Sequence, residues 1–87
     1  MTITPEQKQI IAEVDKKTKK LIANLATREK ILVQMLEYMP AIKKIISSTD
    51  NHEMDLYCQE YTGFYSYMKI LEDLARGIKT GAIPKRI

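Results

Sequence analysis

The segment YCQEYTGFYSYM, residues 57–68, holds four of the five tyrosines of the chain and its only phenylalanine. The chain of 87 residues has no tryptophan, so this segment carries most of its aromatic surface. At 3.6 residues per helical turn, Tyr57, Tyr61 and Phe64 fall on one side of a helix. The same stripe also includes Met54, Met68, Leu71 and Ala75. Aromatic side chains in one stripe are typical of a core, so we predict that these three are buried, with the tyrosine hydroxyls at its edge.

A second apolar stripe runs along the same predicted helix and contains Tyr67, Ile70 and Leu74. The two stripes cover more than half of the circumference, whereas a helix with a single neighbour needs an apolar arc of about 100°. We therefore expect this helix to contact two others, in a three-helix bundle or in a dimer, with mid-helix Gly63 allowing close approach. Tyr65 and Tyr67 fit a core and a partner contact equally well. The predicted partner-binding residues are Leu56, Gly63, Tyr65, Tyr67, Ile70 and Leu74.

The N-terminal half begins with a clear helix signal. Thr4 can cap the helix, Pro5 suits its first position, and Gln7 stands where a capping box needs Glu or Gln. Hydrophobic residues then recur every three or four positions, the period of an amphipathic helix. Because no glycine or proline occurs between residues 6 and 39, we favour one continuous helix. The alternative is a break near Thr27, which would cap a new helix.

Pro40 marks the next boundary. Its ring removes a backbone hydrogen bond and collides with the preceding turn, so we expect a kink or a break. The helical pattern resumes and ends in a polar turn, residues 47–52, in which Asp50 followed by Glu53 is a capping-box variant. The first helical region is thus predicted to span residues 5–47, with a kink at that proline.

A second long helix is predicted over residues 51–80. Gly81 suits the left-handed position after its last turn and Pro84 prevents its resumption, although Gly77 permits an earlier end. Residues 81–87 are predicted to form a short basic tail.

The predicted fold is all-α. The chain, residues 1–87, is expected to form one domain, a long helical hairpin or a three-helix bundle kinked at Pro40 and completed by dimerisation. Folding of so short a chain buries only about 60% of the surface that the unfolded chain exposes, which also favours a dimer. No apolar run approaches the roughly 18 residues of a membrane span and the N-terminus lacks a secretory signal, so we expect a cytoplasmic protein without membrane contact.

Charge is distributed unevenly along the chain, although the net charge is only +3. Residues 1–49 carry nine Lys or Arg against five Asp or Glu, residues 50–75 one against six, and residues 76–87 four against none. Opposite potentials favour docking of the basic half against the acidic segment, which sets orientation more than stability.

The sequence offers few groups for catalysis or metal binding. His52, the only histidine, has Asp50, Glu53 and Asp55 nearby but lacks the spacing of a metal motif, and a solvated turn is the simpler interpretation. Cys58 is expected to be a small, partly buried side chain. We find no phosphate-binding glycine loop and no catalytic triad, so we predict a non-enzyme without catalytic, metal or cofactor sites.

The remaining functional signal is a basic cluster on the first helix. Its residues are Lys16, Lys17, Lys19 and Lys20, and the basic tail adds Lys85 and Arg86. Several lysines on one helix can contact the phosphates of a nucleic acid, although acidic neighbours dilute the cluster and a solvated helix face explains it more simply. We therefore predict a small adaptor or regulator that binds another protein through its helix faces, with a nucleic-acid-binding protein as the alternative.

Overall fold

The computed structural model describes residues 3–85, and every regular element in that range is a helix. The helices are α1 (Pro5–Ala23), α2 (Arg28–Gln34), the short 3₁₀ helix η1 (Leu36–Tyr38), α3 (Met39–Ser48), α4 (Asn51–Glu60) and α5 (Thr62–Ala75). The all-α class predicted from the sequence is confirmed for the described residues.

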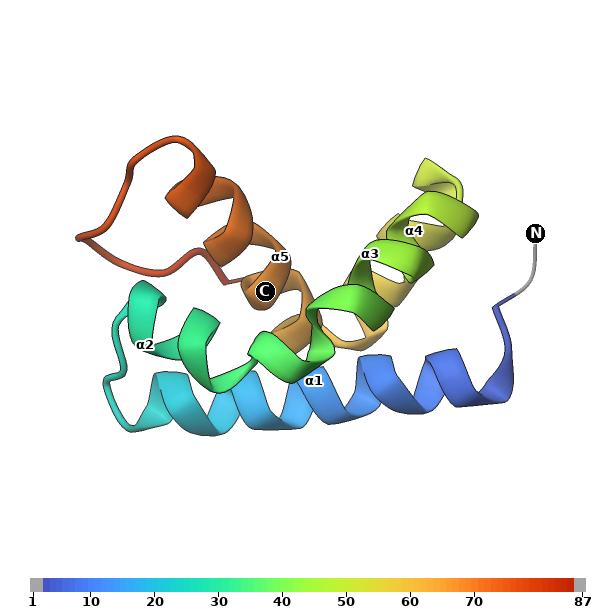
Figure 1. Ribbon diagram of the computed structural model, residues 1–87, viewed down its shortest axis with the longest axis horizontal. Coiled ribbons are helices and arrows are strands. Elements are labelled where there is room, and N and C mark those ends of the chain that lie inside the picture. The colour runs from blue at the N-terminus through green and yellow to red at the C-terminus, as the bar shows by residue number, and fades with distance from the viewer. Residues whose placement is uncertain (1–2, 86–87) are drawn as a thin grey trace.

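Helix α1 lies along one side of the molecule, and α5 and α3 pack on it (Figure 1). α5 makes the most extensive contact with α1, and it also packs against α2 and α4. α3 rises away from the middle of α1, a short turn after Ser48 leads into α4, and the chain after α5 turns back toward α2. The radius of gyration is 12.3 Å, close to the value of about 12 Å expected for a compact chain of this length.

The core lies between α1, α5 and the α2–α3 segment. Its fully buried hydrophobic side chains are Ile11, Val14, Ile31, Met35, Ile42, Ile45, Phe64, Tyr67 and Ile70. Phe64 is buried as predicted, while Tyr57 and Tyr61 are half-buried and pack against this core. The hydroxyl of Tyr67 donates a hydrogen bond to Sδ of Met39 at 3.1 Å, and burial raises the pKa of this phenol above its ordinary value of 10.0.

α1 begins with the capping box that the sequence predicts. The amide of Gln7 donates to Oγ1 of Thr4 at 3.1 Å, and the amide of Thr4 donates to Oε1 of Gln7 at 3.0 Å. Pro5 occupies the first turn, where its missing N–H leaves no helical bond unmade. The reciprocal pair satisfies two amides that the helix itself cannot satisfy.

The prediction of one continuous N-terminal helix is wrong. α1 ends at Ala23 with a Schellman motif around Leu25, whose φ is 60°. The amide of Leu25 donates to the carbonyl of Ile22 and the amide of Ala26 donates to that of Leu21, both at 3.0 Å. Leucine is unusual at this left-handed position, which normally takes glycine, and for this reason the sequence shows no stop signal there.

The alternative prediction, a break capped by Thr27, is confirmed. α2 starts at Arg28, and Oγ1 of Thr27 accepts a hydrogen bond from the amide of Lys30 at 3.2 Å. The break expected at Pro40 is also found, because the chain passes through η1 and starts α3 at Met39, with Pro40 in the first turn of that helix. Proline fits there because a first-turn amide has no acceptor within its own helix. The first helical region is therefore a series of separate helices rather than one kinked helix.

The prediction of one long second helix over residues 51–80 is also wrong. Asp50 caps α4 as expected, with its Oδ1 accepting from the amide of Glu53 at 2.8 Å. The helix then breaks at Tyr61, where φ is −114° and ψ is 83°, and α5 starts at the next residue. α5 ends at Ala75, earlier than predicted.

The break at Tyr61 is stabilised from outside the two helices that it separates. The side chain of Tyr61 makes no capping bond, but the amide of Gly63 donates to Oδ1 of Asp15 in α1 at 2.6 Å. α1 and α5 approach so closely here that a Cβ on Gly63 would collide with the backbone carbonyl of Asp15. The close approach predicted for Gly63 is thus observed, and the neighbour is α1 of the same chain.

α5 ends with a second Schellman motif, this time with glycine. Gly77 has a φ of 81°, and its amide donates to the carbonyl of Leu74 at 3.1 Å. The amide of Ile78 donates to the carbonyl of Asp73 at 2.8 Å and completes the motif. The earlier end that the sequence allows at Gly77 is therefore the one observed.

Candidate functional site

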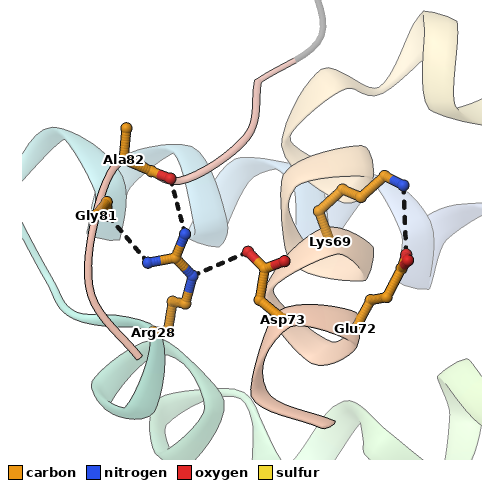
Figure 2. Close-up of polar contacts among 6 residues, drawn as sticks. All are labelled: Arg28, Lys69, Glu72, Asp73, Gly81 and Ala82. Atoms are coloured by element: carbon orange, nitrogen blue, oxygen red, sulfur yellow. Dashed lines mark hydrogen bonds and ion pairs between the residues drawn. The ribbon is translucent and has the colours of Figure 1, made fainter. Parts of the chain in front are cut away.

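The chain after α5, residues 76–85, folds back over the molecule and is called the C-terminal strap below. Arg28, the first residue of α2, uses all three guanidinium nitrogens here, two to hold the strap and one to bind α5 (Figure 2). Its Nε donates to Oδ2 of Asp73 at 3.0 Å. Its Nη1 donates to the carbonyl of Gly81 at 2.9 Å, and Nη2 donates to that of Ala82 at 2.7 Å. Because the side chain of Arg28 is only 4% exposed, its contact with Asp73 is a buried ion pair.

A basic tail was predicted for residues 81–87. Its described part, residues 81–85, is docked on the rest of the molecule. Ile83 packs against the core, and Lys85 lies beside α1, where it lines a pocket together with Lys19. Arg86, a predicted nucleic-acid contact, lies outside the described residues.

A groove of about 410 Å³ lies between α4 and α5. The residues that line it are Asn51, Met54, Asp55 and Cys58 from α4, and Tyr65, Met68, Lys69 and Glu72 from α5. In each helix these residues are spaced i, i+3, i+4 and i+7, so each helix lines the groove with one face over about two turns. Methionine, cysteine and tyrosine supply its apolar surface, and the other four residues add amide, carboxylate and ammonium groups. We call this the α4–α5 groove.

The α4–α5 groove exists because the chain bends at Tyr61. In one continuous helix, the residues before and after this position would lie along a single straight cylinder. The bend instead produces two helices that pack against each other and diverge away from Tyr61 (Figure 1). Two stripes that would follow one another along a helix therefore face each other across the groove.

Ion pairs and hydrogen bonds order the polar side chains around the groove. On α5, Nζ of Lys69 lies 3.3 Å from Oε2 of Glu72 (Figure 2). Nη2 of Arg76 lies 2.7 Å from the other carboxylate oxygen of Glu72. On α4, Oδ2 of Asp55 accepts from Nε2 of Gln59 at 2.8 Å. On the α5 side Glu72 therefore lies between two cations, and on the α4 side the carboxylate of Asp55 is held by Gln59.

Among the predicted partner-binding residues, Tyr65 lines the α4–α5 groove, with its ring centre 5.6 Å from Nζ of Lys69. Leu56 is 51% exposed, but helical spacing places it on the face of α4 opposite to the groove. Leu74 is half-buried and packs against the core. The groove therefore retains one member of the predicted set.

Gly63, Tyr67 and Ile70 are buried inside the chain, so they offer no surface to a partner. The wide apolar arc predicted for their helix is present on α5. Three helices of the same chain, α1, α2 and α4, pack against α5 and cover it. The expectation of more than one neighbour is thus met without a second molecule.

Most of the groove was not predicted from the sequence. Met54 and Met68 were placed in the core stripe of a continuous helix, and both do pack against the core while they line the groove. The missing signal is the bend at Tyr61, which turns one stripe into two facing ones. The sequence does contain one indication, the two methionines on this stripe, because methionine adapts to irregular surfaces.

The four lysines of the predicted basic cluster are exposed on α1. They are Lys16, Lys17, Lys19 and Lys20. Nζ of Lys19 lies 3.3 Å from Oδ1 of Asp15. Nζ of Lys17 lies 3.8 Å from Oε1 of Glu37 and 4.9 Å from the centre of the Tyr38 ring. The pKa of Lys17 is raised, chiefly by its hydrogen bond with Tyr38.

Lys19 and Lys85, far apart in the sequence, meet at a pocket of about 260 Å³. Its other lining residues are Ile22, Ala23, Thr62, Gly63 and Ser66. Two ammonium groups give this pocket a positive character, but the carboxylate of Asp15 already contacts both Lys19 and the amide of Gly63. The Asp15 carboxylate therefore occupies the position at which an external anion would bind to the N-terminus of α5.

Within residues 3–85, no three His, Cys, Asp or Glu side chains come together as a group that could hold a metal ion. His52 is exposed in the first turn of α4, and Cys58 is a buried thiol in the wall of the α4–α5 groove. No helix in the described part of the chain is long and apolar enough to cross a membrane.

Comparison with protein-family models, with curated proteins and with solved structures finds no match for this chain. Its own surfaces are therefore the basis for proposing a function.

Proposed function

We propose that the protein is a cytoplasmic, non-enzymatic adaptor or regulator that binds another protein in the α4–α5 groove. The observation that supports this most strongly is the groove itself, about 410 Å³ in volume and lined by two methionines, a tyrosine and a cysteine. A protein of this kind acts by holding or blocking its partner and uses no chemistry of its own.

The side chains of the groove suit contact with another protein. Methionine is flexible and polarisable, so it adapts to partner surfaces of different shape. Tyrosine and methionine are both enriched at protein interfaces, and Tyr65 is the predicted partner residue that stands in the groove. Covering half-buried apolar side chains is favourable by roughly 25 cal/mol per Å² of apolar surface removed from water.

Affinity capture from the native cell extract tests this proposal when matched variants are compared with the wild type. Met68→Glu places a charge in the apolar wall of the groove, and Leu36→Glu places the same charge on an exposed apolar residue of η1. We expect a partner that the wild type and Leu36→Glu retain and that Met68→Glu loses. Circular dichroism checks that both variants are folded, and a partner retained equally by all three proteins contradicts the groove as the binding site.

Nucleic-acid binding is the second candidate function, and one observation favours it. The C-terminal strap brings Lys85 to the side of Lys19, which extends the basic cluster of α1. Titration against DNA and RNA at two salt concentrations tests it, together with a variant in which the four lysines of the cluster are glutamine. Affinity that falls steeply with salt and is lost in the variant supports nucleic-acid binding, because lysine–phosphate contacts release counterions.

Homodimerisation, predicted from the sequence, stays a proposal. The apolar arc that motivated it is covered inside the chain, and the α4–α5 groove is now the surface on which a second copy would bind. Sedimentation over a range of protein concentrations measures this association directly, and a monomer throughout the micromolar range contradicts it.

A further inference from the structure

The C-terminal strap is attached to the rest of the molecule near its far end. Nη1 and Nη2 of Arg28 donate to the carbonyls of Gly81 and Ala82. The next residue, Ile83, packs its side chain against the core. Among the described residues, these two hydrogen bonds are the ones that join residues 79–85 to the rest of the chain. We call Arg28 and the core surface that Ile83 covers the strap site.

Residues 76–80, all exposed, form a hinge before this attachment. A pocket of about 250 Å³ lies between Lys79, Thr80 and the turn that joins α1 to α2, so this part of the strap does not pack closely on the molecule. Gly77 has a φ of 81° and Gly81 has a φ of 91°. Because glycine adopts positive and negative φ about equally well, rotation at these two positions can redirect the strap as a unit.

The strap site is suited to an extended segment of chain. Nε of Arg28 is paired with Asp73 in α5, which orients the planar guanidinium so that Nη1 and Nη2 face the strap (Figure 2). Release of the strap frees these two donors and uncovers the core surface beneath Ile83. Covering this surface and pairing these donors again are both favourable. An open strap site therefore binds a segment that offers two successive carbonyls followed by an aliphatic side chain.

We infer that the strap site of one chain binds the strap of a second copy, so that two chains exchange straps. The exchanged strap has the same sequence and makes the same contacts as the chain's own strap, so the interface needs no new complementary surface. Pro84 favours an extended conformation of Ile83 before docking, which lowers the entropy cost of binding. This contact is separate from the α4–α5 groove and does not rest on binding there.

The balance between the closed monomer and the exchanged dimer depends on protein concentration and on the hinge. A short linker holds a segment near its own site at an effective concentration on the order of millimolar. We therefore expect the wild type to exchange straps only when the protein itself approaches about that concentration. A hinge that cannot turn back toward its own Arg28 should shift the exchange to much lower concentrations.

Gly77→Pro is the hinge variant that tests the inference in the full chain. Proline fixes φ near −65°, so the chain cannot adopt the φ of 81° with which the strap turns back. We expect sedimentation to show a dimer of Gly77→Pro at a concentration about 100-fold lower than for the wild type. Addition of Ile83→Glu to this variant removes the apolar anchor and should restore the monomer. Circular dichroism checks that both proteins are helical.

A labelled peptide with the sequence of residues 76–87 probes the strap site without the hinge variant. It is titrated by fluorescence anisotropy against the full Ile83→Glu chain, in which the chain's own strap is weakened while Arg28 and Asp73 are retained. We expect the peptide to bind this chain at least about ten-fold more tightly than the wild type, whose strap site is filled. A peptide that itself carries Ile83→Glu should bind neither chain.

A Gly77→Pro dimer that persists with Met68→Glu and is lost with Ile83→Glu supports the exchange of straps. Loss of the dimer with Met68→Glu instead assigns the contact to the α4–α5 groove and overturns the inference. A folded Gly77→Pro chain that stays monomeric also overturns it, and binding of the peptide would then assign the strap site to a segment of a different protein. Failure of the Ile83→Glu chain to bind the peptide overturns the inference whether or not Gly77→Pro folds.

Discussion

The chain interrupts its helices at residues 24–27 and again at Tyr61, and the two breaks are built in different ways. Between α1 and α2 the break consists of neighbouring residues, a Schellman motif with Leu25 in a left-handed conformation and a cap from Thr27. Between α4 and α5 the residue at the break supplies no side-chain cap, and the first turn of α5 bonds instead to the carboxylate of Asp15 in α1.

The difference determines what each break depends on. A local break needs only its own residues, because its hydrogen bonds close within about six positions of the chain. The second break needs α1 in place, since its acceptor lies 48 residues away from the donor. Substitution of one exposed residue can therefore tune the first break, whereas the second depends on the packing of two distant helices.

The largest expected effect comes from Arg28, the residue that follows the first break. Arg28→Gln removes the cation of the buried ion pair with Asp73. It also removes the two N–H donors that bond to the carbonyls of Gly81 and Ala82 in the C-terminal strap. Loss of one partner of a buried pair typically costs about 3–5 kcal/mol. We expect urea denaturation to show a fall of about 3 kcal/mol in the free energy of unfolding, and limited proteolysis to cut the strap.

Lys30→Gln is the matched control for this variant, because it removes an exposed cation from the same helix. We expect it to change the free energy of unfolding by less than about 0.5 kcal/mol. Equal stability of the two variants would mean that Arg28 does not join the first break to the strap.

Gly63→Ala tests the second break, because the sign of the change in the free energy of unfolding depends on how closely α1 approaches α5. In an isolated helix, alanine is more stable than glycine by about 1 kcal/mol. In this structure the added methyl would lie 2.7 Å from Oδ1 of Asp15 and would collide with the backbone carbonyl of the same residue. We expect thermal and urea denaturation to show a net loss of about 2 kcal/mol, as for other overpacked sites. A gain in stability would contradict the close approach of α1 and α5.

Asp15→Asn addresses the cap of α5 with a smaller change. The substitution keeps the shape of the side chain and removes its charge, so we expect a loss of about 1 kcal/mol in the free energy of unfolding. Hydrogen exchange of the Gly63 amide should become faster, while Glu13→Gln, an exposed change on the same helix, should leave it unaltered. Because the amide oxygen of asparagine can still accept the Gly63 N–H, unchanged exchange in Asp15→Asn would show that the negative charge of Asp15 does not stabilise this bond.

The smallest expected effect is a gain at the first break. Leu25 is 90% exposed and has a φ of 60°, so its replacement removes backbone strain and almost no packing. We expect Leu25→Gly to raise the free energy of unfolding by about 0.5–1 kcal/mol in urea denaturation. Gly77→Ala is the reciprocal control, because φ there is 81° and an added methyl meets nothing within 4 Å. It should lose about 1 kcal/mol, and a loss in both variants would contradict the assigned strain at Leu25.

The features that the sequence predicts correctly are those whose partners lie close along the chain. The caps at Thr4 and Asp50 each accept from an amide three residues further on, so their residue types are sufficient to locate them. Pro40 marks a helix boundary because its ring acts on the turn beside it. Leu25 is the exception, because a local motif normally marked by glycine is built here on a residue that gives no such signal.

The candidate site is less predictable than the helical class, because it depends on tertiary contacts. Tyr65 is recognisable by residue type, but the groove that it lines requires the bend at Tyr61 and hence the contact with Asp15. Tyr67 and Ile70 were assigned to a partner surface because an apolar stripe indicates that a neighbour exists. The stripe does not indicate which chain supplies that neighbour, and here it is the same chain.

The pairing of Asp15 with Gly63 also bears on how the protein is made, because it joins an early part of the chain to one 48 residues later. During translation, Ile11 and Val14 of α1 emerge before the helix that will cover them. At roughly 5–20 residues per second, they stay exposed to solvent for several seconds. A chaperone with affinity for apolar helices has this interval in which to bind the nascent chain, and the core closes only after α5 has left the ribosome.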